Sequence, residues 1–217
     1  MSIEMKYIFL SVLALSLFAC SDKEPVTSVI TQSTDGKRYT NAYFDIQVDK
    51  PEGWFAQDPE QTIKQSSQGA RVVAGEDKNM KAILAESIKT TVPIFAFFKH
   101  EPGTPVKFNP SVIAVAENIE VMPGIKTGCD YLFHARSLLK NAAIELEVTD
   151  DCHTESINNA PLGYFDARIS VNGADIYQKY YACIKNQHAL SFIQTYFDDQ
   201  SKSEVDQVTS SLLLSCQ

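Results

Sequence analysis

The sequence predicts an α+β fold, with a central antiparallel sheet that carries helices on both faces. Three observations predict this class. The dipeptide Asn172-Gly173, which suits a tight type I′ turn, joins two β-rich segments. The segment 189–197 carries apolar residues at both odd and even positions, as expected for a strand covered on both faces. Segments with apolar residues at helical spacing alternate with the strands, so helices cover the sheet.

The first half of the chain contains a strand, two helices and two buried strands. Alternating apolar residues predict a strand at 43–48, followed by a Pro-Gly turn at 50–53. Trp54, the only tryptophan, is expected to bury that turn against the core. The next elements are a weakly patterned helix at 59–73, a helix carrying Met80 to Ile88 after the cap residue Asp77, and strands at 93–99 and 111–116.

The second half begins with a helix whose start and end are both indicated by the sequence. Thr127 and Asp130 have the spacing of a capping box, and the apolar stripe that follows runs to about Asn141. The remaining elements are a strand at 144–148, a polar loop through Cys152 to Asn159, strands at 164–171 and 176–184, a turn at 185–187, the strand at 189–197, and a closing helix with a Ser201–Glu204 capping box.

Four cysteines follow Cys20, and an even number in an exported chain predicts two disulfides. The helix after Cys129 runs one way and the next strand returns, which brings Cys152 back toward it. The closing helix reverses the direction of the last strand, which brings Cys216 near Cys183. We therefore predict the pairs Cys129–Cys152 and Cys183–Cys216. None of the cysteines forms a C-x-x-C motif, so neither a thioredoxin-like redox site nor a zinc knuckle is supported.

Residues 1–19 have the pattern of a secretory signal. Lys6 precedes the apolar run 7–18, which is too short for a bilayer span of about 20 residues. The run ends in Leu17-Phe18-Ala19-Cys20, which resembles the bacterial lipobox. The resemblance implies that the Cys20 thiol receives a diacylglycerol, that the signal is cut before it, and that the new amino terminus is acylated (palmitate). The alternative is an ordinary signal peptide, with Cys20 a cysteine of the mature chain by chance.

The lipobox reading also predicts a location and a domain division. Ser21 stands where an acidic residue would favour inner-membrane retention under the enterobacterial rule, so the outer membrane is favoured. Residues 20–38 are polar and lack aromatics, which predicts a flexible tether; a binding epitope in the tether is the alternative. Residues 39–217 are expected to form one globular domain.

Composition excludes some partners. Acidic residues number 27 and basic residues 19, and the net charge is −8. That balance argues against nucleic acid and against electrostatic docking on anionic lipid. The expected membrane contact is therefore the lipid on Cys20.

The segments 43–54, 177–184 and 189–197, followed by the closing helix, resemble the PsbP-like fold. That fold is an α/β/α sandwich with a central antiparallel sheet, and the resemblance covers most of residues 40–215. It is found in the lumenal PsbP protein of photosystem II, in a Ran-GTPase-binding nuclear import factor and in bacterial envelope lipoproteins, one implicated in phage adsorption. Because these relatives mostly act as binding or assembly modules, the resemblance implies no catalytic residue.

Motifs for chemistry are sparse. The sequence contains no G-x-S-x-G, H-E-x-x-H or P-loop motif. Asp150, Asp151 and His153 form a local cluster, but their spacing fits no known metal-ligand loop, and a solvated loop is favoured. Asp198-Asp199 is expected to favour the N-terminus of the last helix, with calcium binding as the alternative. We therefore expect no metal and no cofactor.

Tyr177, Tyr180, Tyr181 and Tyr196 gather on two adjacent predicted strands. Sheet packing is the simpler explanation, and an aromatic surface for a protein partner or a glycan is the functional one. The sequence thus predicts a non-enzymatic envelope lipoprotein that docks an unknown envelope protein partner through an exposed patch. A periplasmic small-ligand carrier or hydrolytic enzyme is the alternative, and it would need a polar cleft around His134, His153 or His188 and a titratable residue of shifted pKa.

Overall fold

The structure, a computed structural model, describes residues 30–32, 36–171 and 173–216. Its helices are α1 (Pro59–Ala74), α2 (Lys78–Thr90), α3 (Gly128–Lys140) and α4 (Asp199–Ser210). Its strands are β1 (Ile30–Gln32), β2 (Arg38–Asn41), β3 (Ile46–Asp49), β4 (Phe55–Ala56), β5 (Thr91–Phe98), β6 (Ser111–Asn118), β7 (Leu146–Val148), β8 (His153–Ile157), β9 (Ala160–Val171), β10 (Ala174–Lys185) and β11 (His188–Tyr196). The predicted signal, Cys20 and most of the predicted tether lie outside the described residues.

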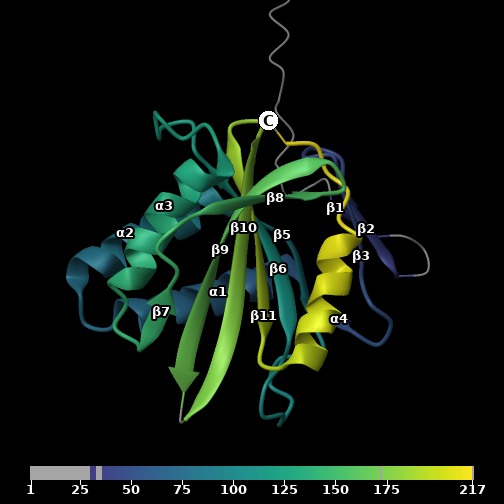
Figure 1. The fold of residues 1–217 in the computed structure, drawn as a ribbon, viewed down its shortest axis with the longest axis horizontal. Helices are drawn as coiled ribbons and strands as arrows, with labels where there is room; N and C mark the ends of the chain where they lie inside the picture. Colours follow the sequence, from purple (N-terminus) through teal and green to yellow (C-terminus); the bar gives the residue numbers. More distant parts are fainter. Residues whose placement is uncertain (1–29, 33–35, 172, 217) are drawn as a thin grey trace, which may run out of the picture.

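An antiparallel sheet with the strand order β4-β5-β6-β11-β10-β9-β7 forms the centre of the molecule, and β8 also pairs with β9 (Figure 1). β11 occupies the middle of this order, as its two apolar faces predict. β1, β2 and β3 form a second, smaller antiparallel sheet. The predicted α+β class, with a central antiparallel sheet, is confirmed.

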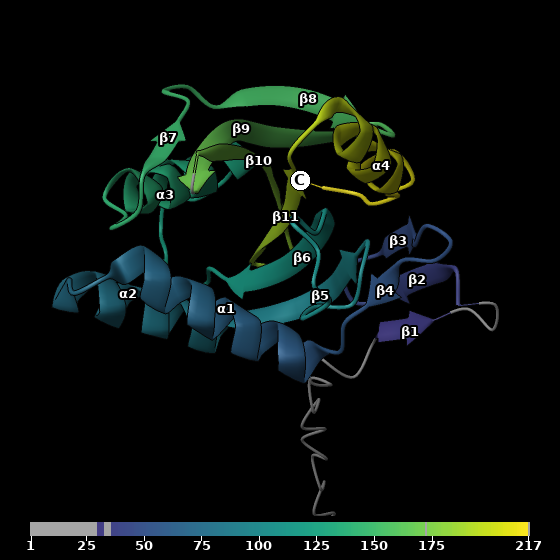
Figure 2. The same cartoon turned by 90° about the horizontal axis from the view of Figure 1, so that it is seen from below.

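Helices cover both faces of the large sheet. Figure 2 shows α4 on one side of the sheet and α3 on the other, with α1 and α2 along the end formed by β5 and β6. The main core lies under α4, where Val205, Val208 and Leu212 pack against Phe97 and Phe192. A second core lies under α3, where Leu132 packs against Phe165 and Ala182. The single tryptophan, predicted as an anchor of the turn before β4, is buried in the main core.

Local chemistry explains the best-predicted boundaries. Asp77 caps α2 by accepting from the backbone N–H groups of Asn79 and Met80. The capping box predicted at Thr127 and Asp130 is present at the start of α3. Asn186 and Gln187 both have positive φ, which matches the two-residue turn between β10 and β11.

The start of α3 lies unusually close to the sheet because two glycines meet there. A Cβ on Gly128 would lie 1.9 Å from the backbone oxygen of Ala182, and a Cβ on Gly163 would lie 2.7 Å from the backbone nitrogen of Cys129. The first disulfide, Cys129–Cys152, lies where α3 comes this close to the sheet. The second disulfide, Cys183–Cys216, ties the segment after α4 to β10. Both are the pairs expected from the sequence, and disulfides of this kind are typical of a compartment outside the reducing cytosol.

Several boundaries differ from the sequence prediction, and four of the differences have a clear physical reason. The polar loop expected from Cys152 to Asn159 contains β8, whose polar side chains are tolerated because it is an edge strand that, among the described strands, pairs with β9 alone. The strand expected at 43–48 begins at Ile46, because Asp45 has a positive φ and Phe44 N–H bonds the side chain of Asn41.

The other two differences concern the tether and the last helix. The stretch assigned to the tether, 20–38, includes β1 and the first residue of β2, because backbone pairing with β2 and β3 orders them despite their polar sequence. The closing helix is capped by Asp198 and not by Ser201. Asp198 accepts from Ser201 N–H, and Ser201 Oγ accepts from Asp198 N–H, so the capping box starts three residues earlier than expected.

Candidate functional site

The face of the large sheet under α4 carries a regular grid of aromatic and charged side chains. Alternate residues of a strand point to one face, and the hairpin registers align them across β9, β10 and β11. We call this grid the tyrosine face. Its three rows, read from β9 to β11, are Tyr164–Tyr181–Phe192, Asp166–Lys179–Gln194 and Arg168–Tyr177–Tyr196.

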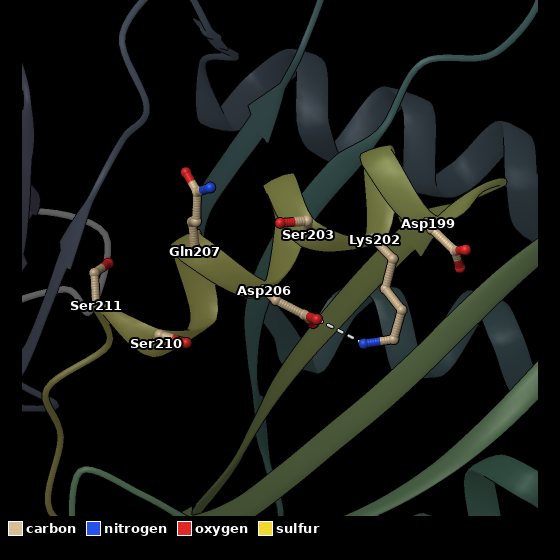
Figure 3. A pocket seen from close by; sticks show the side chains of 7 residues that line it. All are labelled: Asp199, Lys202, Ser203, Asp206, Gln207, Ser210 and Ser211. Atoms are coloured by element: carbon tan, nitrogen blue, oxygen red, sulfur yellow. Dashed lines mark hydrogen bonds and ion pairs between the residues drawn. The ribbon is translucent and has the colours of Figure 1, made fainter.

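α4 and β8 border the tyrosine face. α4 contributes Lys202 and Asp206, whose Nζ and Oδ2 atoms lie 2.6 Å apart. Figure 3 shows this pair projecting from α4, beside an open hollow of about 590 Å³ that runs along the helix. The hollow is lined by Asp199, Lys202, Ser203, Asp206, Gln207, Ser210 and Ser211. β8 contributes Glu155, whose Oε2 lies 3.1 Å from Nζ of Lys179. The face is therefore framed by two elements distant from each other in sequence.

Lys179 is held between two tyrosine rings and a carboxylate. Its Nζ lies 3.9 Å from the ring centroid of Tyr164, 4.8 Å from that of Tyr181, and 3.1 Å from Oε2 of Glu155. A cation over aromatic rings and beside a carboxylate is favourable because the ring faces and the carboxylate are both negative. Burial, and then the hydrogen bond to Glu155, raises the pKa of the Tyr181 hydroxyl, which stays protonated.

The other two cations of the face are also engaged. Lys202, besides its bond to Asp206, lies 5.8 Å from the ring centroid of Tyr196. Arg168 forms ion pairs with Glu147 at 2.7 Å and with Asp175 at 3.2 Å. Each cation of the face thus already has a carboxylate partner.

Asp166 is the exception among the acids. It stands opposite Lys179 in the strand register, yet Lys179 bonds Glu155 instead. Within the part of the chain that the structure describes, the Asp166 carboxylate makes no hydrogen bond and no ion pair; its two bonds to Thr149 are made by its backbone N–H and C=O. Partial burial raises the pKa of Asp166 above its usual range, and the nearby Lys179 only partly opposes that effect. The carboxylate groups around the face (Glu147, Glu155, Asp166, Asp175 and Asp206) outnumber the cations (Arg168, Lys179 and Lys202).

Gln194 fixes α4 to the middle of the face. It is 1% exposed, and its Nε2 donates to the backbone oxygen of Val205, to Oδ1 of Asp206 and to Oγ1 of Thr209. All three partners are acceptors, which sets the orientation of the amide. Among the described residues its Oε1 has no hydrogen-bond partner.

Three of the four tyrosines singled out in the sequence meet on this face. Tyr177 and Tyr196 stack with ring centroids 5.7 Å apart, and Tyr177 is 37% exposed. Tyr180 points to the other face, where it stacks on Phe165 under α3 at 4.7 Å, so its inclusion in the group is wrong. A strand has a period of two, and neighbours in sequence cannot share a face.

The sequence reasoning missed Tyr164, Asp166 and Lys179. The signal for them was present in the sequence, because the two-residue turn predicted from Asn172-Gly173 would pair 166 with 179 and 164 with 181, and the strand register agrees. Glu155, Lys202 and Asp206 had no such signal, because the placement of β8 and α4 over the sheet depends on contacts distant in sequence.

Of the other predicted candidates, Asp150 and Asp198 have structural roles. Asp150 forms an ion pair with Lys140 at 2.8 Å, and this contact lowers the pKa of its carboxyl. His153 lies on β8 with its ring 5.6 Å from that of Tyr164. Asp198 caps α4, and its bonds to Ser201 lower its pKa. In the described segments no group of three His, Cys, Asp or Glu residues is placed to hold a metal ion.

A second, smaller cavity of about 260 Å³ lies where β4 ends against β5 and the start of α1. Its wall includes Tyr39, Phe95 and Phe97, and it contains Gln57, whose buried Oε1 has no partner in the described chain. The cavity is not lined by His134, His153 or His188, around which the enzyme alternative expects its cleft.

In the described part of the chain, no helix is both long and apolar enough to cross a membrane. No family model and no curated protein matches the sequence. Solved structures with similar folds include cyanobacterial PsbP from Synechocystis (14% identity, 91% of this chain and 98% of that chain, TM-score 0.47). Others are LpqN, involved in cell envelope biogenesis of Mycobacterium tuberculosis (13%, 79% and 83%, TM-score 0.43), and PA94 of unknown function from Pseudomonas aeruginosa (11%, 56% and 83%, TM-score 0.43). Identities and TM-scores this low assign neither a family nor a function.

Proposed function

We propose that this protein is a non-enzymatic, lipid-anchored module of the bacterial cell envelope that docks a protein partner through the tyrosine face. The observation that carries the proposal is the arrangement of Tyr177 and Tyr196 beside Asp166. Tyrosine is enriched at protein interfaces because it combines a rigid apolar ring with a polar tip. Here a stacked and partly exposed pair lies next to a carboxylate without a partner.

The state of the charged groups favours recognition over catalysis. Lys179, Lys202 and Arg168 are each held in ion pairs, so none is poised to exchange a proton. Nucleophilic catalysis needs a nucleophile and a base within hydrogen-bond reach of each other. The carboxylate of Asp166 has no such neighbour among the described residues.

The envelope location is supported by the disulfides and by the N-terminal pattern. Two disulfides favour an oxidising compartment. The apolar run 7–18 before Leu17-Phe18-Ala19-Cys20 favours export and lipidation at Cys20, and Ser21 favours the outer membrane. Several acyl chains make a durable anchor, whereas a single chain would be marginal.

The anchor is tested by fractionating cells that express a Cys20→Ser variant. The wild-type protein is expected in the membrane pellet, and the variant in the soluble periplasmic fraction. Mass spectrometry of the wild-type amino terminus should detect the acyl groups. A variant that still pellets with membranes would contradict the anchor.

Docking is tested in the same cells with the photoreactive residue p-benzoylphenylalanine in place of Tyr177. The matched control carries it in place of Phe133, which is 58% exposed on α3 at the opposite side of the sheet. A protein adduct is expected from position 177 and not from position 133. Equal adducts from both positions, or none from position 177, would exclude the tyrosine face as the docking surface.

A small-ligand carrier is the second candidate, and the 260 Å³ cavity favours it. The unpartnered Oε1 of Gln57 would accept a hydrogen bond from a small apolar molecule that carries a hydroxyl. Benzyl alcohol is the probe, with toluene as its match without the donor. If the carrier function holds, benzyl alcohol raises the melting temperature of the wild type more than that of a Gln57→Leu variant, and toluene does not distinguish them.

A further inference from the structure

We infer that the tyrosine face recognises an arginine side chain of its partner protein, with the guanidinium seated between the Asp166 carboxylate and the stacked rings of Tyr177 and Tyr196. This inference rests on the proposed function and deepens it by naming the chemistry of the partner segment.

The first argument is charge complementarity. The ion pairs of Arg168, Lys179 and Lys202 use four of the carboxylates around the face, and Asp166 is left over. The face therefore carries an excess of negative charge after its own cations are matched. A partner that covers this face must bring a cation, because a half-buried carboxylate that loses its remaining water without a partner is costly.

The second argument is that the protein already builds one such site from its own residues. Lys179 lies over the rings of Tyr164 and Tyr181 and bonds Glu155. The neighbouring site has the same components, two tyrosine rings and a carboxylate, but the two lysines near Asp166, Lys179 and Lys202, each bond another carboxylate.

The components of the second site are close together. Asp166 lies diagonally across the strand pair from Tyr177, because Asp166 faces Lys179 and Tyr177 faces Arg168. Burial raises the pKa of the Tyr196 hydroxyl, and the nearby charge of Asp166 raises it further. Lys202, from α4, also lies near Asp166, with its Nζ 5.8 Å from the ring centroid of Tyr196 and 2.6 Å from Oδ2 of Asp206, which holds it.

Arginine fits this site better than lysine. Its planar guanidinium can stack on a tyrosine ring and at the same time donate two parallel hydrogen bonds to a carboxylate. Tyr177 is partly exposed, which leaves access for a side chain from outside. The site thus predicts a partner with an accessible arginine on a loop or an extended segment.

The probe is the capped peptide Ac-Gly-Arg-Gly-Arg-Gly-NH2, titrated by calorimetry into the detergent-solubilised full protein. Its twin carries citrulline, the neutral isostere, in place of both arginines. The arginine peptide is expected to bind, and Asp166→Asn and Tyr177→Ala are each expected to weaken it by about tenfold. The citrulline peptide is expected to show no measurable binding.

The matched control is Glu76→Gln, which removes the same charge from a fully exposed side chain in the turn between α1 and α2. It is expected to change the affinity by less than about twofold, since exposed charges this far away are screened by salt. Circular dichroism checks that each variant is folded. Equal weakening by Glu76→Gln and Asp166→Asn, or equal binding of the two peptides, would overturn the inference.

Two further outcomes separate the inference from the proposed function. If position 177 crosslinks to a protein but the arginine peptide does not bind, the arginine chemistry is wrong and the docking function stands. If chitotetraose binds at Tyr177 and neither the peptide nor a protein does, the face is a glycan surface and both proposals fail.

Discussion

Two carboxylates on opposite faces of the same sheet differ in their hydrogen bonding: one is fully bonded within the fold, and the other is not. Glu117, on β6 under α2 and α3, is 5% exposed and accepts hydrogen bonds from Ser87, Thr90 and Tyr131. Asp166, on β9 under α4, is half-buried and accepts none within the described chain. The first carboxylate ties two helices to the sheet, whereas the second is left for something outside the chain.

This difference separates polar groups that stabilise the fold from polar groups that are available to bind a partner. A buried charge is tolerated when its hydrogen bonds are made within the fold, and Glu117 meets that condition with three hydroxyl donors. A charge that the fold leaves unsatisfied lowers stability and is a candidate for binding. The unsatisfied carboxylate of Asp166 therefore marks the tyrosine face as a candidate binding surface as much as its tyrosines do.

The largest expected effect comes from removing the satisfied carboxylate. Glu117→Leu leaves the buried hydroxyl of Tyr131 and the hydroxyl of Ser87 without their acceptor, so we expect a loss of about 3 kcal/mol in the free energy of unfolding. Urea unfolding followed by circular dichroism measures it. A loss no larger than that of Asp166→Leu would remove the contrast between the two carboxylates.

A smaller effect is expected when a single hydrogen-bond donor is removed. Tyr131 O–H donates to Oε2 of Glu117 at 2.6 Å, and burial, together with that carboxylate, raises the pKa of the Tyr131 hydroxyl. Tyr131→Phe is therefore expected to lower the free energy of unfolding by about 1–2 kcal/mol, because the carboxylate loses a buried partner.

The matched tyrosine is Tyr177 on the other face, which is partly exposed. Tyr177→Phe keeps the ring stack and is expected to change the free energy of unfolding by less than about 0.5 kcal/mol. Equal losses from the two variants would mean that the tyrosine face is as structural as the Glu117 cluster.

How far the sequence predicts these two regions depends on the range of the contacts. The dipeptide Asn172-Gly173 predicts a two-residue hairpin turn, and such a turn determines which residues of β9 and β10 face each other, so the pairing of Asp166 with Lys179 follows from local chemistry. The capping box at Thr127 likewise fixes where α3 begins. Lys179 forms its ion pair with Glu155 and not with Asp166, and Glu155 lies on β8, where the sequence predicts a loop.

The hydrogen bonds of Glu117 to Ser87, Thr90 and Tyr131 also could not be predicted from the sequence. Nothing near Glu117 in the sequence indicates that Ser87 and Tyr131 lie beside it, because they come from helices about thirty residues before and fourteen residues after it. Helix packing over a sheet depends on many small contacts, which no short motif records. Strand register was therefore accessible from the sequence, and the polar groups bridging between layers were not.

The smallest effect, and the one with the most diagnostic sign, is expected from Asp166→Asn. Burial raises the pKa of Asp166 in the folded state, so the folded protein holds that proton more tightly than the unfolded chain does. As the pH rises from the Asp166 pKa of the unfolded chain to that of the folded protein, the free energy of unfolding falls. Above the folded-state pKa the full destabilisation by the buried charge is present. Asn carries no charge, so the variant is expected to be as stable as the wild type or slightly more stable at pH 7, and to lose that advantage at a pH below the pKa of the unfolded chain.

Thermal unfolding of the two proteins across that pH range measures the difference. Lys179, Glu155, His153 and Lys202 also face the carboxylate, and His153→Gln serves as the control for the one histidine among them. A variant less stable than the wild type at pH 7 would mean that Asp166 makes a stabilising contact within the fold. In that case Asp166 would belong with Glu117, and the tyrosine face would lose the vacant carboxylate on which its recognition of a cation depends.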